Sequence, residues 1–334
     1  MSEPIIPYGR HTITEADIQS VVKVLQSPWL TQGPLVPRFE QSLTDSLDVK
    51  YAIATNSATS ALHLACLALG LAPGDRIWTS PITFVASANC GLYCGSSVDF
   101  VDIDIFTGLI SLESLKIKLN QADKEGALPK LIIPVHLAGT SCSMKEVSQL
   151  VRPYGISILE DASHAIGGSY LSKPVGSCEY SDATVFSFHP VKIITTGEGG
   201  AITTNNPELS ERISLQRSHG ITKTPDHFKY NSPGPWYYEQ QHLGFNYRLT
   251  DIQAALGISQ LTQLQSIVNE RRRLHARYQD LLKLLPVELL DIPIDCSSAL
   301  HLSIIRLVGY DATDHKRIFC GLRSEGIGVQ LHYF

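Results

Sequence analysis

The sequence predicts an α/β protein in which helices cover both faces of a mostly parallel sheet. From Tyr51 to about Asp161, short apolar runs typical of strands alternate with longer segments typical of helices. One run, residues 156–159, is apolar throughout, as a parallel strand buried on both faces is expected to be. With 334 residues, of which 43% are hydrophobic, the chain can form one large core and a smaller unit.

The first predicted helix covers residues 14–26 and follows an extended segment that contains Tyr8. Thr14 is a good N-cap, and Asp17 three residues later completes a capping box. The helix ends where Ser27 and Pro28 open a loop rich in proline and glycine.

The middle of the chain supplies most of the sheet. Predicted strands cover residues 51–55, 76–79, 97–103, 131–136 and 156–159. Predicted helices cover residues 61–69, 85–93, 112–119 and 143–154. Ser143 and Glu146 have the spacing of a capping box for the last of these helices. Strands joined by such helices run parallel, with right-handed crossovers.

Two further β-like runs, residues 183–188 and 200–204, flank a short turn, and a predicted helix over residues 207–219 follows. Residues 221–241, rich in proline and aromatic side chains, are expected to form a long loop or hairpin. Thr250 and Gln253 form a capping box before a helical segment that extends to residue 285, in which residues 271–273 are three arginines expected on a solvated face. Strand, helix and strand are predicted at residues 300–308, 313–324 and 328–334, beyond a connection at residues 286–295.

Composition excludes several classes of function. A net charge of −5 provides no basic field for nucleic acid, and no apolar run is long enough to span a bilayer. The N-terminus lacks the apolar core of a signal peptide. The seven cysteines are odd in number, form no CxxC motif and lie mostly in apolar surroundings. We therefore expect a cytoplasmic protein with reduced, structural thiols and no metal site.

A lysine and an acid carry the strongest chemical signal. Lys192 lies in the turn between the runs 183–188 and 200–204, beside the glycine-rich residues 197–200, whose backbone can approach a ligand closely. Upstream, the buried strand 156–159 leads into Glu160 and Asp161, at the sheet edge where open α/β sheets bind ligands. A lone lysine is most often a solvated surface residue. Together with the acid, Lys192 suggests a Schiff-base site in which the lysine forms an imine and the carboxylate keeps a pyridinium nitrogen protonated.

The motifs FSFHPVK and TTGEGGAITTN, preceded by LEDASHAIG, closely resemble the DegT/DnrJ-type sugar aminotransferases, and the resemblance runs from about Pro7 to the last residue. It implies the type I aminotransferase fold with pyridoxal phosphate (PLP) as cofactor. The large PLP-binding domain would comprise residues 1–285, and residues 286–334 would form a partial α+β C-terminal domain. Lys192 would be the imine-forming lysine, and Asp161 the partner of the ring nitrogen.

The resemblance assigns further cofactor contacts. Ala58 and Thr59 would hold the PLP phosphate at the start of the helix that follows strand 51–55, where free N–H groups and the helix dipole favour an anion. Ordinary capping by Ser57 is the alternative. Ser187 would also hold the phosphate. A Ser-His-Asp hydrolase built on Ser187 is disfavoured, because no GxSxG elbow is present.

Two further positions carry aromatic rings, and each has an alternative role. Phe84 is the candidate for stacking on the PLP ring, with a place in the core as the alternative. His164 is assigned to the cofactor surroundings by the resemblance, with a structural hydrogen bond as the alternative.

The substrate site is implied by the resemblance alone, with residues 1–35 contributing to it. The predicted substrate contacts lie in several separate segments: Tyr8, Pro28, Trp29, Leu30, Thr31, Ala58, Ser187, Asn246, His332, Tyr333 and Phe334. Trp29 alternatively packs on the domain. Asn246 would reach the cofactor phosphate of the neighbouring subunit in a homodimer with shared active sites, and an ordinary turn asparagine is the alternative.

The implied reaction transfers an amino group, with glutamate as donor, to C4 of a UDP-linked 4-keto-6-deoxy-2-acetamido hexose. A sugar dehydratase on the same scaffold would replace the lysine by histidine, so Lys192 argues against it. A lysine aldolase would need neither Asp161 nor a phosphate site. A catalytically impaired or regulatory member is the remaining alternative, because family members continue for several tens of residues beyond Phe334.

Overall fold

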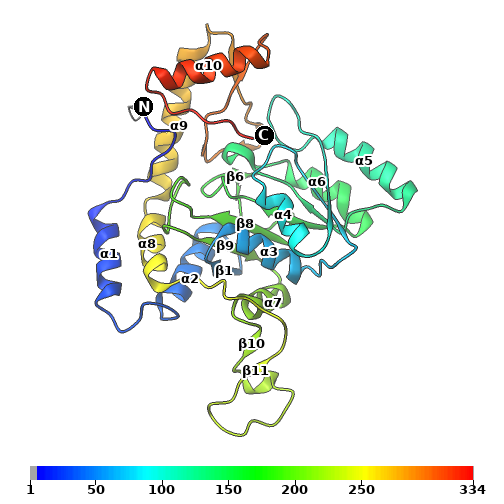
Figure 1. Ribbon diagram of the computed structural model, residues 1–334, viewed down its shortest axis with the longest axis vertical. Helices are drawn as coiled ribbons and strands as arrows, with labels where there is room; N and C mark the ends of the chain where they lie inside the picture. Colours follow the sequence, from blue (N-terminus) through cyan, green and yellow to red (C-terminus); the bar gives the residue numbers. More distant parts are fainter. Residues whose placement is uncertain (1–5, 334) are drawn as a thin grey trace.

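The computed structural model describes residues 6–333, and within them a seven-stranded sheet forms the centre of the molecule (Figure 1). Its spatial order is β1-β9-β8-β5-β4-β2-β3. The strands are β1 (Tyr51–Thr55), β2 (Arg76–Thr79), β3 (Ser97–Phe100), β4 (Leu131–Ile133), β5 (Ser157–Asp161), β8 (Ala183–Ser187) and β9 (Gly200–Thr204). β9 runs antiparallel to both of its neighbours, and the other adjacent pairs are parallel. The predicted mostly parallel α/β sheet is confirmed.

Helices cover both faces because each strand alternates its side chains between two apolar layers. Ile133 and Val185 pack toward one layer, whereas Ile132 and Phe186 pack toward the other, and all four are fully buried. The first layer contains α3 (Ala58–Ala68), α4 (Ala86–Tyr93) and α7 (Pro207–Arg217). The second contains α2 (Leu35–Leu47), α5 (Leu112–Glu125), α6 (Met144–Val151), α8 (Asp251–Leu261) and α9 (Leu264–Leu282).

Two of the three predicted capping boxes form. Thr14 caps α1 (Glu15–Leu25), and Thr250 caps α8, each with reciprocal hydrogen bonds to the third helical residue. The box predicted at Ser143 is wrong, because the Ser143 side chain makes no capping bond. Its expected partner, Glu146, instead accepts a hydrogen bond of 2.7 Å from the Tyr170 hydroxyl, a residue distant in sequence.

The arginines of α9 do not all face solvent, which corrects the sequence-based expectation. Arg271 Nη1 donates to the carbonyl oxygens of residues 300 and 301, at 3.2 and 3.0 Å. Arg272 Nε donates to the carbonyl of residue 298 at 3.2 Å. Only the third, Arg273, forms an exposed pair, with Glu270. Arg271 and Arg272 therefore join α9 to residues 298–301.

The segment after α9 forms a smaller layer at the top of Figure 1. It contains the antiparallel pair β12 (Val287–Leu289) and β14 (Ile305–Leu307), followed by α10 (Ala312–Ser324). Between them, β13 (Cys296–Ser297) returns to the main body and pairs with β6 (Ser169–Tyr170), which also pairs with β7 (Lys173–Pro174). The division at residues 285 and 286 therefore stays a prediction.

The predicted strand at residues 328–334 does not form within the described part, and Phe334 lies outside it. The Gly328 amide donates to the carbonyl of Ile6 at 2.7 Å, and the Ile6 amide donates to that of Gly326 at 3.0 Å. These bonds join the C-terminal segment to the N-terminal one, so both ends of the described chain lie side by side.

The predicted long loop or hairpin at residues 221–241 is a hairpin arm, visible at the bottom of Figure 1. It contains β10 (Ile221–Thr222) and β11 (Glu239–Gln240), which pair antiparallel. Tyr230 and Trp236 at its far end are 74% and 73% exposed. Across residues 6–333, we find no helix that combines the length and the apolar character needed to cross a membrane.

Candidate active site

A cavity of about 710 Å³ opens at the carboxyl end of β5 and brings together most of the predicted site residues. Ten of them line it: Tyr8, Ala58, Thr59, Phe84, Asp161, His164, Ser187, Lys192, His332 and Tyr333. They come from both ends of the described chain and from the tips of β5 and β8. The location agrees with the ligand-binding edge of open α/β sheets.

Asp161, the last residue of β5, directs its carboxylate into the cavity wall and is 5% exposed. Its Oδ1 accepts hydrogen bonds from the Ser163 backbone N–H at 3.1 Å and from Ser163 Oγ at 2.6 Å. Its Oδ2 accepts one from Ser87 Oγ at 2.5 Å. Both oxygens are therefore held by hydroxyl donors, and no cationic side chain pairs with them in the described part of the chain.

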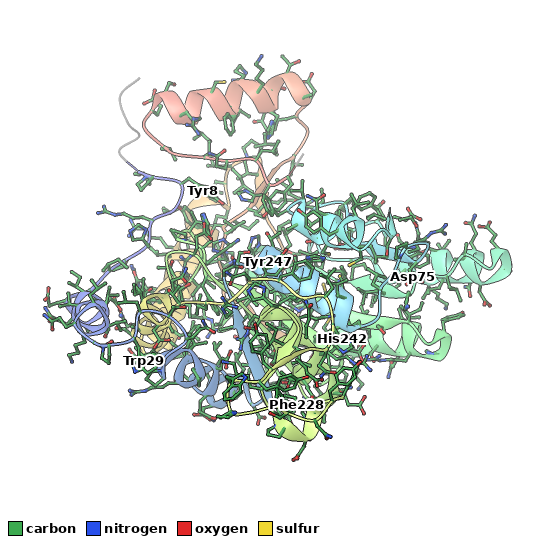
Figure 2. All side chains as sticks on the ribbon, turned by 60° about the horizontal axis from the view of Figure 1, so that its bottom comes forward. Tyr8, Trp29, Asp75, Phe228, His242 and Tyr247 are labelled. Carbon is green, nitrogen blue, oxygen red and sulfur yellow. The ribbon has the colours of Figure 1, made fainter. Side chains whose placement is uncertain are left out.

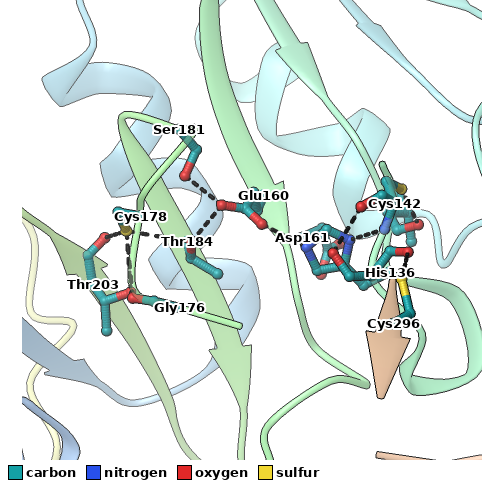
Figure 3. A network of polar contacts seen from close by, with 12 residues as sticks. His136, Cys142, Glu160, Asp161, Gly176, Cys178, Ser181, Thr184, Thr203 and Cys296 are labelled. Atoms are coloured by element: carbon teal, nitrogen blue, oxygen red, sulfur yellow. Dashed lines mark hydrogen bonds and ion pairs between the residues drawn. The ribbon is translucent and has the colours of Figure 1, made fainter. Parts of the chain in front are cut away.

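The neighbouring acid, Glu160, serves a different purpose (Figure 3). It does not line the cavity, because adjacent residues of a strand point to opposite faces. Its carboxylate accepts hydrogen bonds from His136 Nε2 at 2.6 Å, from Thr184 Oγ1 at 3.1 Å and from Ser181 Oγ. The backbone N–H of Cys142 donates to His136 Nδ1 at 3.2 Å, which leaves Nε2 as the nitrogen that carries the proton. Glu160 is thus a buried structural carboxylate.

We expect Glu160→Gln to lower stability by roughly 1–3 kcal/mol, because the amide loses a charged acceptor inside a buried network. Burial alone would raise the pKa of Glu160, but the hydrogen bonds from His136, Ser181 and Thr184 outweigh it and hold that pKa below its ordinary value of 4.5. A carboxyl with a lowered pKa contributes its stability above the unfolded value and loses it as the pH falls through the folded one.

Urea unfolding at several pH values measures this contribution. The gap between wild type and Glu160→Gln should be widest above pH ~5 and should narrow below about pH 4. Glu270→Gln, at an exposed ion pair with Arg273, is the matched control and should change stability far less than Glu160→Gln does. An equal loss in both variants would contradict the structural role of Glu160.

Lys192 lies in the turn between β8 and β9, and its local fold explains why it reaches the cavity. The Lys192 backbone N–H donates to the His189 carbonyl at 2.8 Å, which closes a tight turn. The next two residues, Ile193 and Ile194, are buried in the core and anchor the turn. Burial lowers the pKa of the Lys192 amine to about 8, although the nearby Asp161 carboxylate opposes the shift. Near neutral pH, a much larger fraction of this amine than of an ordinary lysine is therefore neutral, and so nucleophilic.

A cradle for an anion forms where β9 meets the start of α3. A Cβ added to Gly200 would lie 2.6 Å from the Ala58 nitrogen, so only glycine allows this approach. Ser187 is the register partner of Gly200 across β8 and β9, which places it beside the same helix end. Ser57 caps the amide of Ser60, as the alternative interpretation required. The amides of Ala58 and Thr59 have no acceptor within the helix, since a helix leaves its first N–H groups free.

Phe84 is 58% exposed and lines the cavity, so the alternative of a core phenylalanine is wrong. Its ring centroid lies 6.5 Å from that of Tyr333. An exposed, flat aromatic face at a cavity wall suits a planar ligand ring.

A histidine pair forms the wall nearest the C-terminal segment. The rings of His164 and His301 have centroids 4.6 Å apart, and the Tyr333 hydroxyl lies 3.3 Å from His164 Nε2. Burial, followed by the Lys192 charge, lowers the pKa of both histidines well below the ordinary value. Nδ1 of each has no hydrogen-bond partner within residues 6–333. Both rings are therefore neutral and offer a lone pair or an N–H group to the cavity.

Tyr8 and His332 close the cavity from opposite ends of the described chain. The Tyr8 hydroxyl lies 2.6 Å from His332 Nε2, and the two rings stack with centroids 5.4 Å apart. The sequence suggested each residue separately but gave no sign that they touch.

The loop at residues 28–31 and Asn246 do not line this cavity. Figure 2 shows Trp29 well apart from Tyr8, and Trp29 is 53% exposed. Thr31 forms a bridge with Thr250, so the loop is fixed to the start of α8. Asn246 forms a bridge with Ser218 beside the hairpin arm. The roles of Pro28, Trp29, Leu30, Thr31 and Asn246 in substrate or cofactor binding stay predictions.

Several residues that line the cavity were missed. They carry polar or ionisable side chains and comprise Asn56, Ser57, Thr83, Ser163, His189, Glu198 and His301. Asn56 and Ser57 directly precede the predicted phosphate contacts, so extending that segment would have found them. His301 carried no signal, because a histidine within the apolar run 299–305 is typical of an ordinary strand.

A family model described as the DegT/DnrJ/EryC1/StrS aminotransferase family matches residues 11–334. The chain is 39% identical over 331 residues to a Campylobacter jejuni protein named UDP-4-amino-4,6-dideoxy-N-acetyl-beta-L-altrosamine transaminase, covering 98% of this chain and 84% of that one. It is 34% identical to the spore coat polysaccharide biosynthesis protein SpsC of Bacillus subtilis, covering 98% and 83%.

Solved structures agree with these relatives. PseC of Helicobacter pylori, an aminotransferase involved in the biosynthesis of pseudoaminic acid, superposes with a TM-score of 0.89 at 35% identity, over 98% of this chain and 85% of that one. Spr1654 of Streptococcus pneumoniae, a proposed sugar aminotransferase solved in its PLP form, superposes with a TM-score of 0.87 at 29% identity, over 98% and 84%. The predicted aminotransferase fold is confirmed.

Proposed function

The chain belongs to the DegT/DnrJ/EryC1/StrS aminotransferase family, and we propose that it transfers an amino group from glutamate to C4 of a UDP-linked 4-keto-6-deoxy-2-acetamido hexose. Such a reaction belongs to nucleotide-sugar synthesis of the pseudaminic acid type. The observation that most supports this proposal is a single cavity lined by Lys192, Asp161 and the start of α3. The similarity to the Campylobacter jejuni transaminase supports the choice of sugar.

Pyridoxal phosphate is the cofactor, and the residues of the cavity fit it. They offer an amine with a lowered pKa, a carboxylate, an exposed aromatic face and a helix start with free N–H groups. Asn56 Oδ1 is buried beside that helix start without a hydrogen-bond partner among the described residues. When bound, PLP supplies an electrophilic carbon for amines and a ring that withdraws electrons from the reacting carbon.

Each side chain then has a specific task. Lys192 would hold the cofactor and, when its amine is free, would carry a proton for the reacting carbon atoms. Its lowered pKa suits both tasks, because each requires the neutral amine. Asp161 would accept a hydrogen bond from the ring nitrogen and keep that nitrogen protonated. Ala58, Thr59 and Ser187 would bind the phosphate, and Phe84 would contact the ring.

The sugar enters past the residues near the mouth of the cavity. Tyr8, His332 and Tyr333 line this region and offer hydroxyl and imidazole groups for hydrogen bonds to a sugar. We place the nucleotide near residues 28–31. The presence of Lys192 disfavours the dehydratase alternative, in which histidine would replace the lysine.

A panel assay tests the proposed reaction. Purified enzyme is incubated with glutamate and a set of UDP- and dTDP-linked 4-keto sugars, and the products are identified by mass spectrometry. We expect a 4-amino product from the UDP-linked 4-keto-6-deoxy-2-acetamido hexose. Conversion of a dTDP sugar in preference to every UDP sugar would contradict the proposed acceptor. Turnover with another amino donor but none with glutamate would contradict the proposed donor.

We further propose a homodimer with shared active sites. Asn246 lies outside the cavity of its own chain and next to the exposed hairpin arm, from which it can reach a second subunit. Lys192→Ala and Asn246→Asp should each be inactive alone. In a mixed dimer, one site combines an intact Lys192 with the partner's intact Asn246, so activity should return.

Random reassociation of equal amounts makes half of the dimers mixed, with one good site in each, so we expect about a quarter of wild-type activity. Two different affinity tags allow the mixed dimers to be purified and verified. Reassociated wild-type chains control for losses during mixing. Verified mixed dimers that stay inactive would show that each chain builds its own site.

A further inference from the structure

Asp161 is held by two hydroxyl groups of very different origin. Ser163 is two residues away on the same strand end, so its bonds to Oδ1 are local. Ser87 belongs to α4, 74 residues earlier, and bonds to Oδ2 at 2.5 Å. Ser87 is fully buried, so its hydroxyl cannot be replaced by water from the surface. The orientation of the Asp161 carboxylate thus depends on a contact between two distant elements.

The direction of the hydrogen bonds follows from their chemistry. An ionised carboxylate only accepts, so the Ser87 hydroxyl must donate its single proton to Asp161. Thr83 Oγ1 lies 2.7 Å from Ser87 Oγ, and the proton of that bond must therefore come from Thr83. The result is a directed chain from Thr83 through Ser87 to Asp161. Successive hydrogen bonds of this kind polarise and strengthen one another in a buried environment.

Ser87 also fixes the turn that carries Phe84. The Ser87 backbone N–H donates to the Phe84 carbonyl at 3.1 Å, and the Ser87 side chain bonds to Thr83 on the other side of Phe84. Ser87 therefore positions both groups that we assign to the cofactor ring. These are the Asp161 carboxylate, for the ring nitrogen, and the Phe84 side chain, for the face of the ring.

We propose that Ser87 is a positioning residue that orients the Asp161 carboxylate toward the cofactor ring nitrogen. The inference rests on the proposed role of Asp161. Ser87 occupies one lone pair of Oδ2, so the remaining lone pairs of the carboxylate would be available to the ring N–H. Without this donor, the carboxylate would lose a charge-assisted hydrogen bond and its fixed orientation, and it would hold the proton of the ring nitrogen less well.

The test compares Ser87→Ala with Ser96→Ala. Ser96 is a matched control, because it is also a buried serine whose hydroxyl donates to a protein acceptor, the Ala72 carbonyl at 3.1 Å, but it lies outside the cavity. Three quantities are measured: the PLP dissociation constant of the apoprotein, the pH midpoint of the absorbance change of the bound cofactor, and the rate at which excess glutamate changes that absorbance.

For Ser87→Ala we expect a rate about tenfold lower, since hydrogen bonds to charged groups are stronger than those between neutral ones. The pH midpoint should rise by about one unit. The reason is that a cofactor ring whose nitrogen is less fully protonated withdraws less electron density from the titrating group, which then keeps its own proton to higher pH. The PLP dissociation constant should change by less than about threefold, since the phosphate contacts are intact. Ser87→Cys, whose thiol is a weaker donor, should give intermediate values. Ser96→Ala should leave all three quantities unchanged.

A merely structural serine would lower the thermal stability of the apoprotein without moving the pH midpoint. An unchanged midpoint and rate in Ser87→Ala, while Asp161→Asn is impaired, would overturn the role of Ser87 alone. Normal rates in Asp161→Asn would overturn the proposed role of the acid as well. If Ser87→Ala does not fold, Thr83→Val decides the question. An upward shift of the pH midpoint by less than the one unit expected for Ser87→Ala supports the chain of donors. An unchanged pH midpoint refutes it.

Discussion

Lys192→Ala should lose transamination by roughly 10⁴-fold or more, because no other group in the cavity can replace both the nucleophile and the proton carrier. The His164 and His301 rings nearby are neutral but lack a primary amine. The fold should survive, since the turn is held by backbone hydrogen bonds and by the buried Ile193 and Ile194. Turnover of the UDP-linked keto sugar and the visible absorbance after dialysis against cofactor-free buffer measure the effect.

The matched control is Lys173→Ala, which removes an exposed lysine paired with Asp48 and should keep full activity. The pH dependence adds an independent check. Because burial lowers the pKa of Lys192 to about 8, the rate at which wild-type apoprotein takes up PLP should rise with pH through that value. Lys192→Ala should show no such rise. Substantial turnover by Lys192→Ala without added amine would refute the assignment.

Asp161→Asn should still bind PLP but lose activity by about 10²–10⁴-fold. The amide keeps the shape of the side chain and can still accept a hydrogen bond from Ser87. It cannot hold a proton on the ring nitrogen as a carboxylate does, so the electron-withdrawing power of the ring falls. Steady-state turnover and the PLP dissociation constant separate loss of chemistry from loss of binding.

Glu160→Gln is the informative comparison for this variant. Glu160 is adjacent in sequence but faces away from the cavity, so its substitution should reduce stability and leave turnover per folded molecule within about threefold. If Asp161→Asn retains near-normal rates while Glu160→Gln loses them, the two acids have been assigned the wrong way round.

The sequence predicted the residues whose signal is local. A strand that ends in an acid, and a glycine-flanked turn that carries a lysine, identified Asp161 and Lys192 before any spatial arrangement was known. The sheet was equally predictable, because alternating apolar strands and helices allow few arrangements. The assignment of Ala58 and Thr59 came from the family resemblance, because the local residues alone favoured ordinary capping by Ser57, and it stays a prediction.

The sequence failed where a distant residue competes for a partner. Glu146 was expected to cap its own helix, but the Tyr170 hydroxyl binds it instead. Arg271 was expected in solvent, but carbonyl groups of a later segment accept its hydrogen bonds. Ser87 and His301 gained their places only through tertiary contacts, so no local pattern distinguished them. The role of residues 28–31 stays a prediction.

The opposite orientation of Glu160 and Asp161 makes β5 unusually intolerant of changes in length. Deleting or inserting one residue within Ser157–Asp161 would turn every following side chain to the other face. An insertion before Glu160 would bring that residue to the position of Asp161 at the cavity, whereas a deletion would bring Asp161 to the donors of His136, Ser181 and Thr184 with a side chain one methylene too short. Many apolar substitutions can preserve the strand, whereas a single-codon insertion or deletion displaces Asp161 from the cavity and Glu160 from its buried network. In a library of variants, β5 should therefore accept changes of residue far more readily than changes of length.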